Sequence, residues 1–325
     1  MASLTTTHTS AANPEPFQPY ANYLALQREV ESVKKYRMKY LTALIGKDMN
    51  RGILQAQPID IQEEITRLSL AIAQGNADPA EILGYIAAYA DLKSPNFDGP
   101  EEARNLSLKI LEYFKCPQHT PSPYGEYILV CSELTLEDDC QLAINHLKSA
   151  AERGNLYAQY SYATEETLSQ EHLACEPLEW LWAAAQGLYP PALAWWQDEL
   201  LSADTSTDGQ SFLNVEQGQR DEMAESLNLL SHIMDAPQDK QTHCLQNILY
   251  RQEMARKRNR IIYYPQSVLD ALKAWEQSSL PPSDAVEELV KTLYTLAGLH
   301  NPPPINRLAF KETLEAKGPA NGGPL

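Results

Sequence analysis

A tight helix–turn–helix unit recurs in this chain, and the recurrence constrains the fold more than any other feature. Residues 147–163 read LKSAAERGNLYAQYSYA, in which one helical pattern stops at Gly154 and a second begins at once. A large residue, two small residues and a glycine also close the helical patterns at Gly75 and Gly187. Positions i, i+3 and i+4 share one face of a helix, so the small residues allow a neighbouring helix to approach closely. Short helix pairs of this kind bury their apolar faces by stacking on one another.

The spacing assigns equivalent positions to three units. The aligned residues are Leu68, Ala71, Ile72 and Gly75 in the first unit, Leu147, Ala150, Ala151 and Gly154 in the third, and Trp180, Ala183, Ala184 and Gly187 in the fourth. Each glycine is expected to take the left-handed conformation that ends a helix. A degenerate unit over residues 99–134, with its break at Cys116, stands second. The pattern predicts an all-α fold, an α-solenoid of antiparallel helix pairs.

Three segments carry a resemblance to a known family. AIAQGNADPAEILGYIAAYA (71–90), SAAERGNLYAQYSYA (149–163) and WLWAAAQG (180–187) resemble the Sel-one-like repeat, a relative of the tetratricopeptide repeat. That repeat has a helix ending in Ala-Ala-x-x-Gly and a second helix with Ala-x-x-x-Leu-Gly. The chain departs from it where Tyr162-Ala163 and Trp195-Trp196 replace Leu-Gly. The resemblance covers about residues 61–201 and implies an adaptor or scaffold.

The repeats divide the chain into five parts. These are a disordered N-terminus (1–18), an N-terminal capping helix (19–60, with its helical pattern over 21–49), the repeat solenoid (61–205), a C-terminal helical region (206–300) and a mostly disordered tail (301–325). The C-terminal helices are expected either to pack on the array or to form a small separate bundle. Stacked arrays need covered ends, which is why the first long helix is interpreted as a cap.

The charge of −17 is concentrated in the middle of the chain. Residues 61–205 hold 23 acidic and 7 basic side chains, a net charge of −16. Such a field disfavours nucleic acid and anionic membranes and favours a basic protein or peptide partner, although acids on exposed helix faces also simply maintain solubility. The basic stretches KKYRMKY (34–40) and ARKRNR (255–260) are interpreted as solvated helix faces and helix ends rather than nucleic-acid contacts. They also permit head-to-tail self-association.

The cellular compartment is predicted from features that are absent from the sequence. The N-terminus has neither the basic nor the apolar region of a signal peptide, and no apolar run reaches the length of a membrane span. Five irregularly spaced cysteines do not form a disulfide framework, which favours free thiols in a reducing compartment. We therefore expect a cytoplasmic protein.

No motif in the sequence points to catalysis, a metal or a cofactor. His172 and Cys175 are three residues apart and His243 adjoins Cys244, but neither pair has the further ligands that zinc needs. The acidic groups at 137–139 and 165–166 adjoin helix starts, where acids are common. The chain is therefore expected not to be an enzyme, to hold no metal or cofactor and to have no catalytic residues. A hydrolase with an unrecognised Cys–His pair stays the least favoured alternative.

Four of the five tryptophans gather in the fourth unit, at 180, 182, 195 and 196. Trp180 is assigned to the packing face, so Trp182 is expected to point elsewhere around its helix. At least one large aromatic would then be exposed as a binding hot spot, unless the unit has unusual internal packing. The predicted partner-binding residues are Asn145, Ser149, Glu152, Trp182, Tyr189 and Trp196.

The favoured function is a non-enzymatic protein-interaction adaptor or scaffold that uses an acidic, aromatic-containing groove along the first helices. The alternative is an inhibitor or immunity-type protein that neutralises one partner enzyme.

Overall fold

The computed structural model describes residues 16–45, 60–92, 101–137, 140–168, 176–202, 215–258 and 264–301. Every regular element in these ranges is helical, which confirms the all-α fold class. In chain order the α-helices are α1 (Gln18–Ile45), α2 (Ile61–Ala73), α3 (Pro79–Leu92), α4 (Glu101–Lys115), α5 (Pro123–Glu137), α6 (Cys140–Glu152), α7 (Leu156–Leu168), α8 (Glu176–Gln186), α9 (Pro190–Ser202), α10 (Gln217–Asp235), α11 (Gln241–Lys257), α12 (Gln266–Glu276) and α13 (Pro282–Leu296). Short 3₁₀ helices at Pro117–His119 and Gln238–Lys240 precede α5 and α11.

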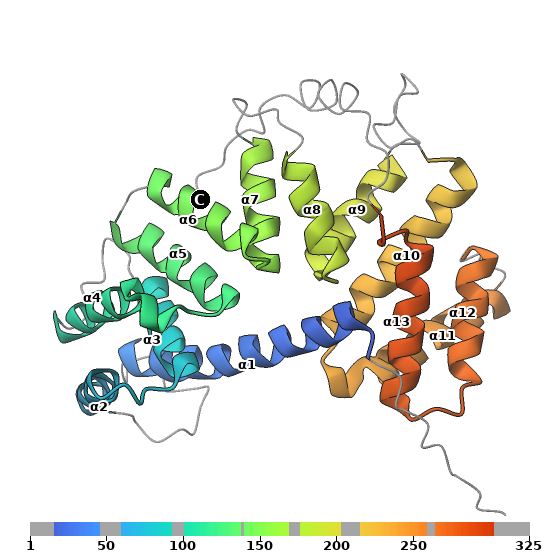
Figure 1. Ribbon diagram of the computed structural model, residues 1–325. Helices are drawn as coiled ribbons and strands as arrows, with labels where there is room; N and C mark the ends of the chain where they lie inside the picture. The colour runs from blue at the N-terminus through green and yellow to red at the C-terminus, as the bar shows by residue number, and fades with distance from the viewer. Residues whose placement is uncertain are drawn as a thin grey trace, which may run out of the picture.

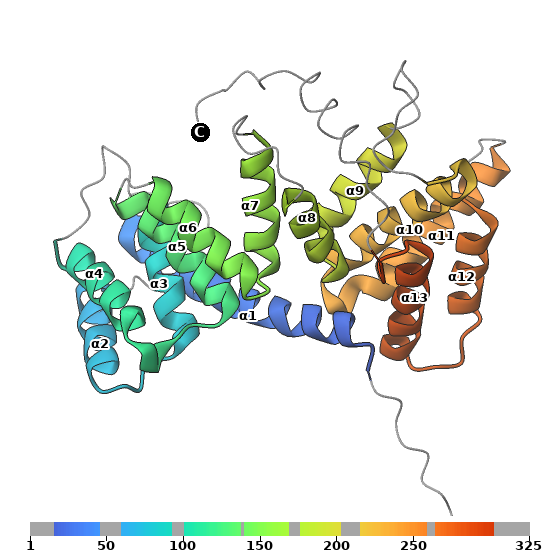
Figure 2. The ribbon, with the colours of Figure 1, turned by 45° about the horizontal axis from the view of Figure 1, so that its top comes forward.

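The helices from α2 to α13 follow an arc, and α1 runs across its open side (Figure 1). Figure 2 shows the same arrangement from a second direction, with α1 beneath the arc. Helix α3 contacts both α4 and α5, and from α5 to α10 each helix contacts the next one. The second helices of the first two pairs, α3 and α5, contact α1 directly. The inner side of the arc is therefore partly filled by a segment of the same chain.

Four helices in the described ranges end in the same way: α2, α6 and α8, as the repeat pattern predicts, and also α13. Gly75, Gly154 and Gly298 have φ of 67°, 87° and 68°, and Leu188 has φ of 64°. In each case this residue donates its N–H three residues back and the next residue donates five residues back, as at Asn155 to Ala150 (3.1 Å). Two such bonds satisfy carbonyl groups that the helix end would leave open.

The fourth unit is offset by one residue from the predicted alignment. The left-handed residue there is Leu188 and not Gly187, so the residues equivalent to Leu147, Ala150 and Ala151 are Leu181, Ala184 and Ala185, all buried. The predicted left-handed conformation of Gly187 is therefore wrong. A shift of one residue turns a helix face by about 100°, which follows from 3.6 residues per turn. That rotation decides which tryptophans of α8 are buried.

Helix α1 packs closest on α3 at Gly84. A Cβ atom built on Gly84 would lie 2.4 Å from Tyr36 Cβ, 2.8 Å from Arg37 N and 2.9 Å from Val33 O. Two of these three neighbours are backbone atoms, which cannot move aside by a change of rotamer. The absence of a side chain at Gly84 therefore sets the distance between α1 and α3.

Gly84→Ala is expected to destabilise the protein, because α1 and α3 have to separate to admit the methyl group. Overpacking of this kind costs about 1–3 kcal/mol, and we expect about 2 kcal/mol in the free energy of unfolding measured with urea. Gly218→Ala on α10 is the matched control, since its Cβ would meet nothing within 4 Å. Equal stability of Gly84→Ala and the wild type would contradict this packing.

The other end of α1 packs on the C-terminal helices. The buried Tyr20 hydroxyl donates to Gln241 Oε1 at 2.7 Å, and the buried Tyr23 hydroxyl donates to the Met234 carbonyl at 2.8 Å. Burial raises the pKa of Tyr20 to about 12, so its phenol remains a donor at neutral pH.

The helix expected over 21–49 is present as α1, with residues 46–59 outside the described ranges. The sequence suggested contact with the first repeat alone, whereas α1 reaches from α3 to α10 and α11.

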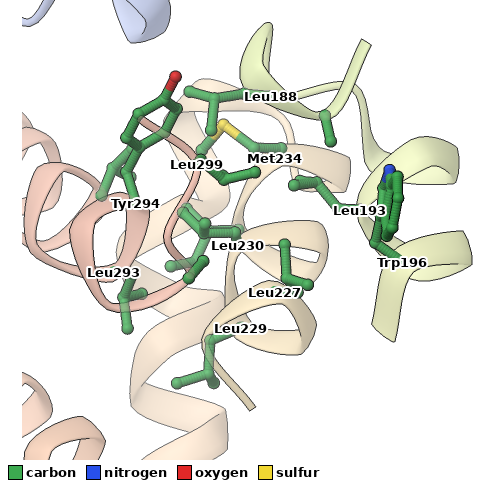
Figure 3. Close-up of a cluster of buried hydrophobic side chains, with 14 of the residues drawn as sticks. Leu188, Leu193, Trp196, Leu227, Leu229, Leu230, Met234, Leu293, Tyr294 and Leu299 are labelled. Atoms are coloured by element: carbon green, nitrogen blue, oxygen red, sulfur yellow. The ribbon is translucent and has the colours of Figure 1, made fainter. Parts of the chain in front are cut away.

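The C-terminal helices share one core with the fourth helix pair and do not form a separate bundle. Buried side chains of α8 and α9, including Leu193 and Trp196, belong to the same cluster as Leu227 and Leu230 of α10 and Leu293 of α13. Figure 3 shows these side chains meeting between α9, α10 and α13. Two smaller clusters hold α1 to α5 together and join α5, α6 and α7.

A charged network fixes α1 against α2 and α3. Lys39 of α1 lies 2.8 Å from Glu64 Oε2 of α2 and 3.3 Å from Glu81 Oε1 of α3. The buried Tyr40 hydroxyl donates to Glu81 Oε1 at 2.9 Å, and Arg67 of α2 pairs with both carboxylates. Burial alone would raise the pKa of Glu64 and Glu81, but their hydrogen bonds outweigh it and hold both pKa values below the ordinary 4.5. The network therefore favours the ionised carboxylates in the folded protein.

The two depressed pKa values predict a loss of stability in acid. Their contribution is fully present above the ordinary pKa of 4.5 and is lost as the pH falls through the lower folded-state values. We expect Glu81→Gln, which has no titrating group there, to differ most from the wild type at pH 7 and least near pH 3. The urea concentrations at the midpoint of unfolding of both proteins, measured between pH 3 and pH 7, test this prediction. A difference that stays constant with pH would contradict the network.

Candidate functional site: a tyrosine-lined cleft beneath helix α1

A cleft of about 370 Å³ lies between α1 and the starts of α7 and α9. We call it the central cleft. Its lining residues are Tyr23, Leu24, Gln27, Arg28, Glu31 and Lys34 of α1, Tyr157 of α7, Tyr189, Pro190 and Pro191 at the start of α9, and Met234, Asp235, Ala236, Pro237, Gln238 and Gln241 around the α10–α11 connection. Helix α1 forms one wall, and the starts of α7 and α9 together with the α10–α11 connection form the other. The cleft exists because α1 touches the arc at both ends.

A row of five tyrosines leads along the array into this cleft. The tyrosine row consists of Tyr124, Tyr127, Tyr157, Tyr160 and Tyr189, with neighbouring ring centroids 4.9 to 6.4 Å apart. Three of them lie near the starts of second helices, although not at equivalent positions: Tyr124 and Tyr157 are the second residues of α5 and α7, and Tyr189 directly precedes α9. An aromatic ring thus stands near the start of each of these three helices. Tyr157 and Tyr189, whose centroids are 4.9 Å apart, reach the cleft itself.

The cleft combines neutral aromatic walls with balanced charge. Burial raises the pKa of Tyr189, and it also raises that of Tyr157 against the opposing effect of a hydrogen bond with Gln27. Both phenols therefore stay protonated at neutral pH and can donate hydrogen bonds. The charged side chains of the lining are Arg28, Glu31, Lys34 and Asp235, all exposed and with opposite signs in equal number. Such a surface suits an uncharged, extended peptide backbone with apolar side chains better than a small charged ligand.

Of the predicted binding residues, only Tyr189 lines the central cleft. Asn145 and Glu152 are exposed on α6, while Ser149 is half-buried and donates to Glu126 Oε1 at 3.4 Å. These three residues belong to a first helix, whereas the cleft is bounded by α1 and the starts of second helices. The structure therefore does not bring the six predicted residues together into one site.

The expected exposure of Trp182 and Trp196 is wrong. Trp182 is 3% and Trp196 0% exposed, and their rings meet edge to face with centroids 4.9 Å apart. The physical reason is the one-residue offset of α8: Leu181, not Trp180, is the large residue equivalent to Leu147, which turns Trp182 inward. Trp196 stands eight residues after Leu188, equivalent to the buried Tyr162 after Gly154. Neither indole can contact a partner without unfolding of the core.

A second hollow of about 290 Å³ lies between α4, α5 and α6. It includes His146 and Arg153 of α6, and so lies near the predicted first-helix residues. Arg153 is already paired with Glu126 and donates to the Pro121 carbonyl at 3.1 Å. The hollow lacks the aligned aromatic rings of the central cleft, which is the better candidate for a binding site.

Within the described ranges, no group of three or more His, Cys, Asp or Glu side chains is arranged to hold a metal ion. Cys116, Cys131 and Cys244 form no disulfide. Burial raises the pKa of Cys244, and its Sγ lies 3.6 Å from the His232 carbonyl, which is the opposite of an activated nucleophile. The pair formed by His172 and Cys175 lies outside the described residues.

The tyrosines could be found from the sequence, but the cleft could not. Tyr124, Tyr157 and Tyr189 each lie within two residues of the start of a second helix, although at different offsets from the preceding helix end. Arg28, Glu31 and Lys34 could not be found in this way, because only the long-range packing of α1 brings them opposite the tyrosine row.

No family model, curated protein or solved structure matches this chain. In the part of the chain that the structure describes, no helix is long and apolar enough to cross a membrane.

Proposed function

We propose that this chain is a non-enzymatic protein-interaction adaptor that binds an extended segment of a protein partner in the central cleft. The observation that carries the proposal is the tyrosine row, which continues from the array into a cleft walled by α1. Tyrosine provides a large, rigid contact area with a hydrogen-bonding end, and it is enriched where proteins bind one another. Tyr157 and Tyr189 offer two such contacts side by side in the cleft, with centroids 4.9 Å apart.

The architecture proposed for this function is an α-solenoid of the Sel-one-like type. Its support is the repeated helix end at Gly75, Gly154 and Leu188, together with the sequential packing of α5 to α10. In this proposal α1 covers the inner face of the first repeat through Gly84, and also closes the array by reaching the C-terminal helices. The net charge of −16 over residues 61–205 favours a partner with basic character.

Blocking the cleft should abolish partner binding without affecting the fold. Gln238 is exposed at the cleft, so Gln238→Trp fills it from the rim, whereas Gln62→Trp places the same residue on the exposed face of α2. In affinity capture from a lysate of the native host, we expect the proteins retained by the wild type to be reduced about tenfold with Gln238→Trp, a loss of about 1.4 kcal/mol. Gln62→Trp should retain them like the wild type.

Circular dichroism of both variants checks that they are folded. Retention that is equal for the two variants would contradict a binding site in the cleft. Retention of one stoichiometric enzyme, lost with Gln238→Trp, would keep the site but favour an inhibitor over an adaptor.

A further inference from the structure

The hollow between α4, α5 and α6, here called the second hollow, is separate from the central cleft. Its volume is about 290 Å³, and none of its described lining residues also lines the central cleft. Ligand pockets in proteins usually measure about 300–1,000 Å³, so the second hollow is at the small end of that range. At about 30 Å³ for each molecule of liquid water, it has room for about ten waters. Its size therefore suits a small ligand rather than a peptide.

The lining of the second hollow is apolar where it is buried and charged where it is exposed. Leu111, Leu129 and Val130 are buried side chains of α4 and α5. The side chains of Lys115 and Arg153 are 57% and 37% exposed. A ligand with an apolar body and a charged end matches this arrangement, because its body leaves water while its charge stays near the surface.

Charge selects an anion in the second hollow, although it selects neither sign in the central cleft. Among the described lining residues, Lys115 and Arg153 are cationic and Glu126 is the one carboxylate, which leaves one positive charge in excess. The central cleft has two side chains of each sign. One excess positive charge is neutralised by a ligand with a single negative charge. The imidazole of His146 lies in the same lining and adds a group that can donate a hydrogen bond to an anion.

Arg153 is fixed in position by its neighbours. Its guanidinium pairs with Glu126 and donates to the Pro121 carbonyl at 3.1 Å. Glu126 in turn accepts a hydrogen bond from Ser149 at 3.4 Å. A guanidinium has five N–H donors, and these two bonds use one donor each, which leaves the others for a ligand. Arginine binds a carboxylate through two parallel hydrogen bonds, so a preoriented Arg153 favours a carboxylate over other anions.

We infer that the second hollow binds a small monocarboxylate with an apolar body. The body packs against Leu111, Leu129 and Val130, and the carboxylate binds Arg153 and Lys115. A free amino acid does not fit, because its ammonium group would lie next to two cations. The inference goes beyond the proposed function: this ligand binds independently of a partner in the central cleft, and it contacts α4, α5 and α6 at once.

Titration of the full chain with para-fluorophenylacetate, followed by fluorine NMR, tests the site. This probe has an aromatic body and one carboxylate, and para-fluorophenylacetamide has almost the same shape without the charge. We expect the acid to bind about tenfold more tightly than the amide, because only the acid forms charge-assisted hydrogen bonds. Lys115→Gln should weaken binding of the acid about threefold, as the loss of one exposed charge does. Lys109→Gln is the matched control, since Lys109 is an exposed cation of α4 outside the second hollow.

Arg153→Gln should weaken binding of the acid about tenfold, and circular dichroism checks that this variant is folded. Equal affinity for the acid and the amide would overturn the inference, as would the absence of binding at about 10 mM acid. Equal effects of Lys115→Gln and Lys109→Gln would also overturn it, because the acid would then respond only to the overall charge. Each of these results leaves the proposed function standing, since Gln238 lines the central cleft and not the second hollow.

Discussion

Trp196→Ala should be among the most destabilising single substitutions in this protein. The Trp196 side chain is fully buried and packs edge to face against both Trp182 and Trp195, with centroids 4.9 and 5.0 Å apart. It lies in the core that joins the fourth helix pair to α10 and α13. Truncation of a buried tryptophan to alanine costs about 3–5 kcal/mol, because it removes apolar contacts and leaves a cavity that the surroundings fill only in part. Urea denaturation followed by circular dichroism measures this loss.

The control for Trp196→Ala is an aromatic residue on the surface. Tyr250 of α11 is 65% exposed, so Tyr250→Ala should change the free energy of unfolding by no more than about 0.5 kcal/mol. Weakened partner binding by Trp196→Ala with unchanged stability would restore the original interpretation of this residue as an exposed contact. That result would also contradict the register of α8 and α9.

Glu81→Ala should cost nearly as much, for an electrostatic reason. Glu81 is 7% exposed and accepts from Tyr40, Lys39 and Arg67. Its removal leaves one carboxylate, Glu64, for two cations, and deprives the buried Tyr40 hydroxyl of its best acceptor. Breaking a buried ion pair costs about 3–5 kcal/mol. We expect about 3 kcal/mol, because the Lys39 and Arg67 side chains are 29% and 46% exposed and regain water.

An exposed ion pair provides the comparison. Glu253 of α11 pairs with Arg256 and Lys257, whose side chains are 78% and 62% exposed. Glu253→Ala should therefore be nearly neutral in the same urea titration. If Glu81→Ala were equally neutral, the network would not be what holds α1 on α2 and α3.

The repeat pattern in the sequence predicted the helices of the units, but in the fourth unit it did not predict the residue at which the first helix ends. Small residues before Gly75 and Gly154 marked helix ends that the structure confirms. In the fourth unit the same pattern pointed to Gly187, yet Leu188 takes the left-handed conformation although a non-glycine residue is disfavoured there. The Leu156 side chain packs directly over Gly187, where a Cβ would lie 2.3 Å from Leu156 Cδ2. A glycine in close packing was thus taken for one needed for backbone conformation.

The path of α1 could not be read from the sequence for a different reason. Its apolar stripe shows that one face is buried but does not say against what. The contacts that hold its N-terminal end join residues more than 200 positions apart, such as Tyr20 with Gln241 and Tyr23 with Met234. Local patterns carry no information on such pairs, and the central cleft, which depends on them, could therefore not be predicted.

The negative charge of residues 61–205 is partly neutralised by basic residues of the same chain. Its field was expected to favour a basic partner, and α1, which carries five basic and two acidic residues between 18 and 45, lies against it. Arg37 pairs with Asp91 of α3 at 2.7 Å, and Lys39 pairs with Glu64 and Glu81. Part of the negative charge is thus neutralised by ion pairs within the same chain. The remaining acidic residues are the ones that we propose a basic partner meets.

Hydrogen exchange of the full-length chain, alone and with the protein retained in the capture experiment, tests the central claim most directly. If the central cleft is the binding site, amide protection should increase in residues 24–34 of α1 and in 192–196 at the start of α9, and α6 should be unaffected. Protection confined to residues 144–153 of α6 would place the partner on the face of the first helices, and would contradict the cleft as the site of binding.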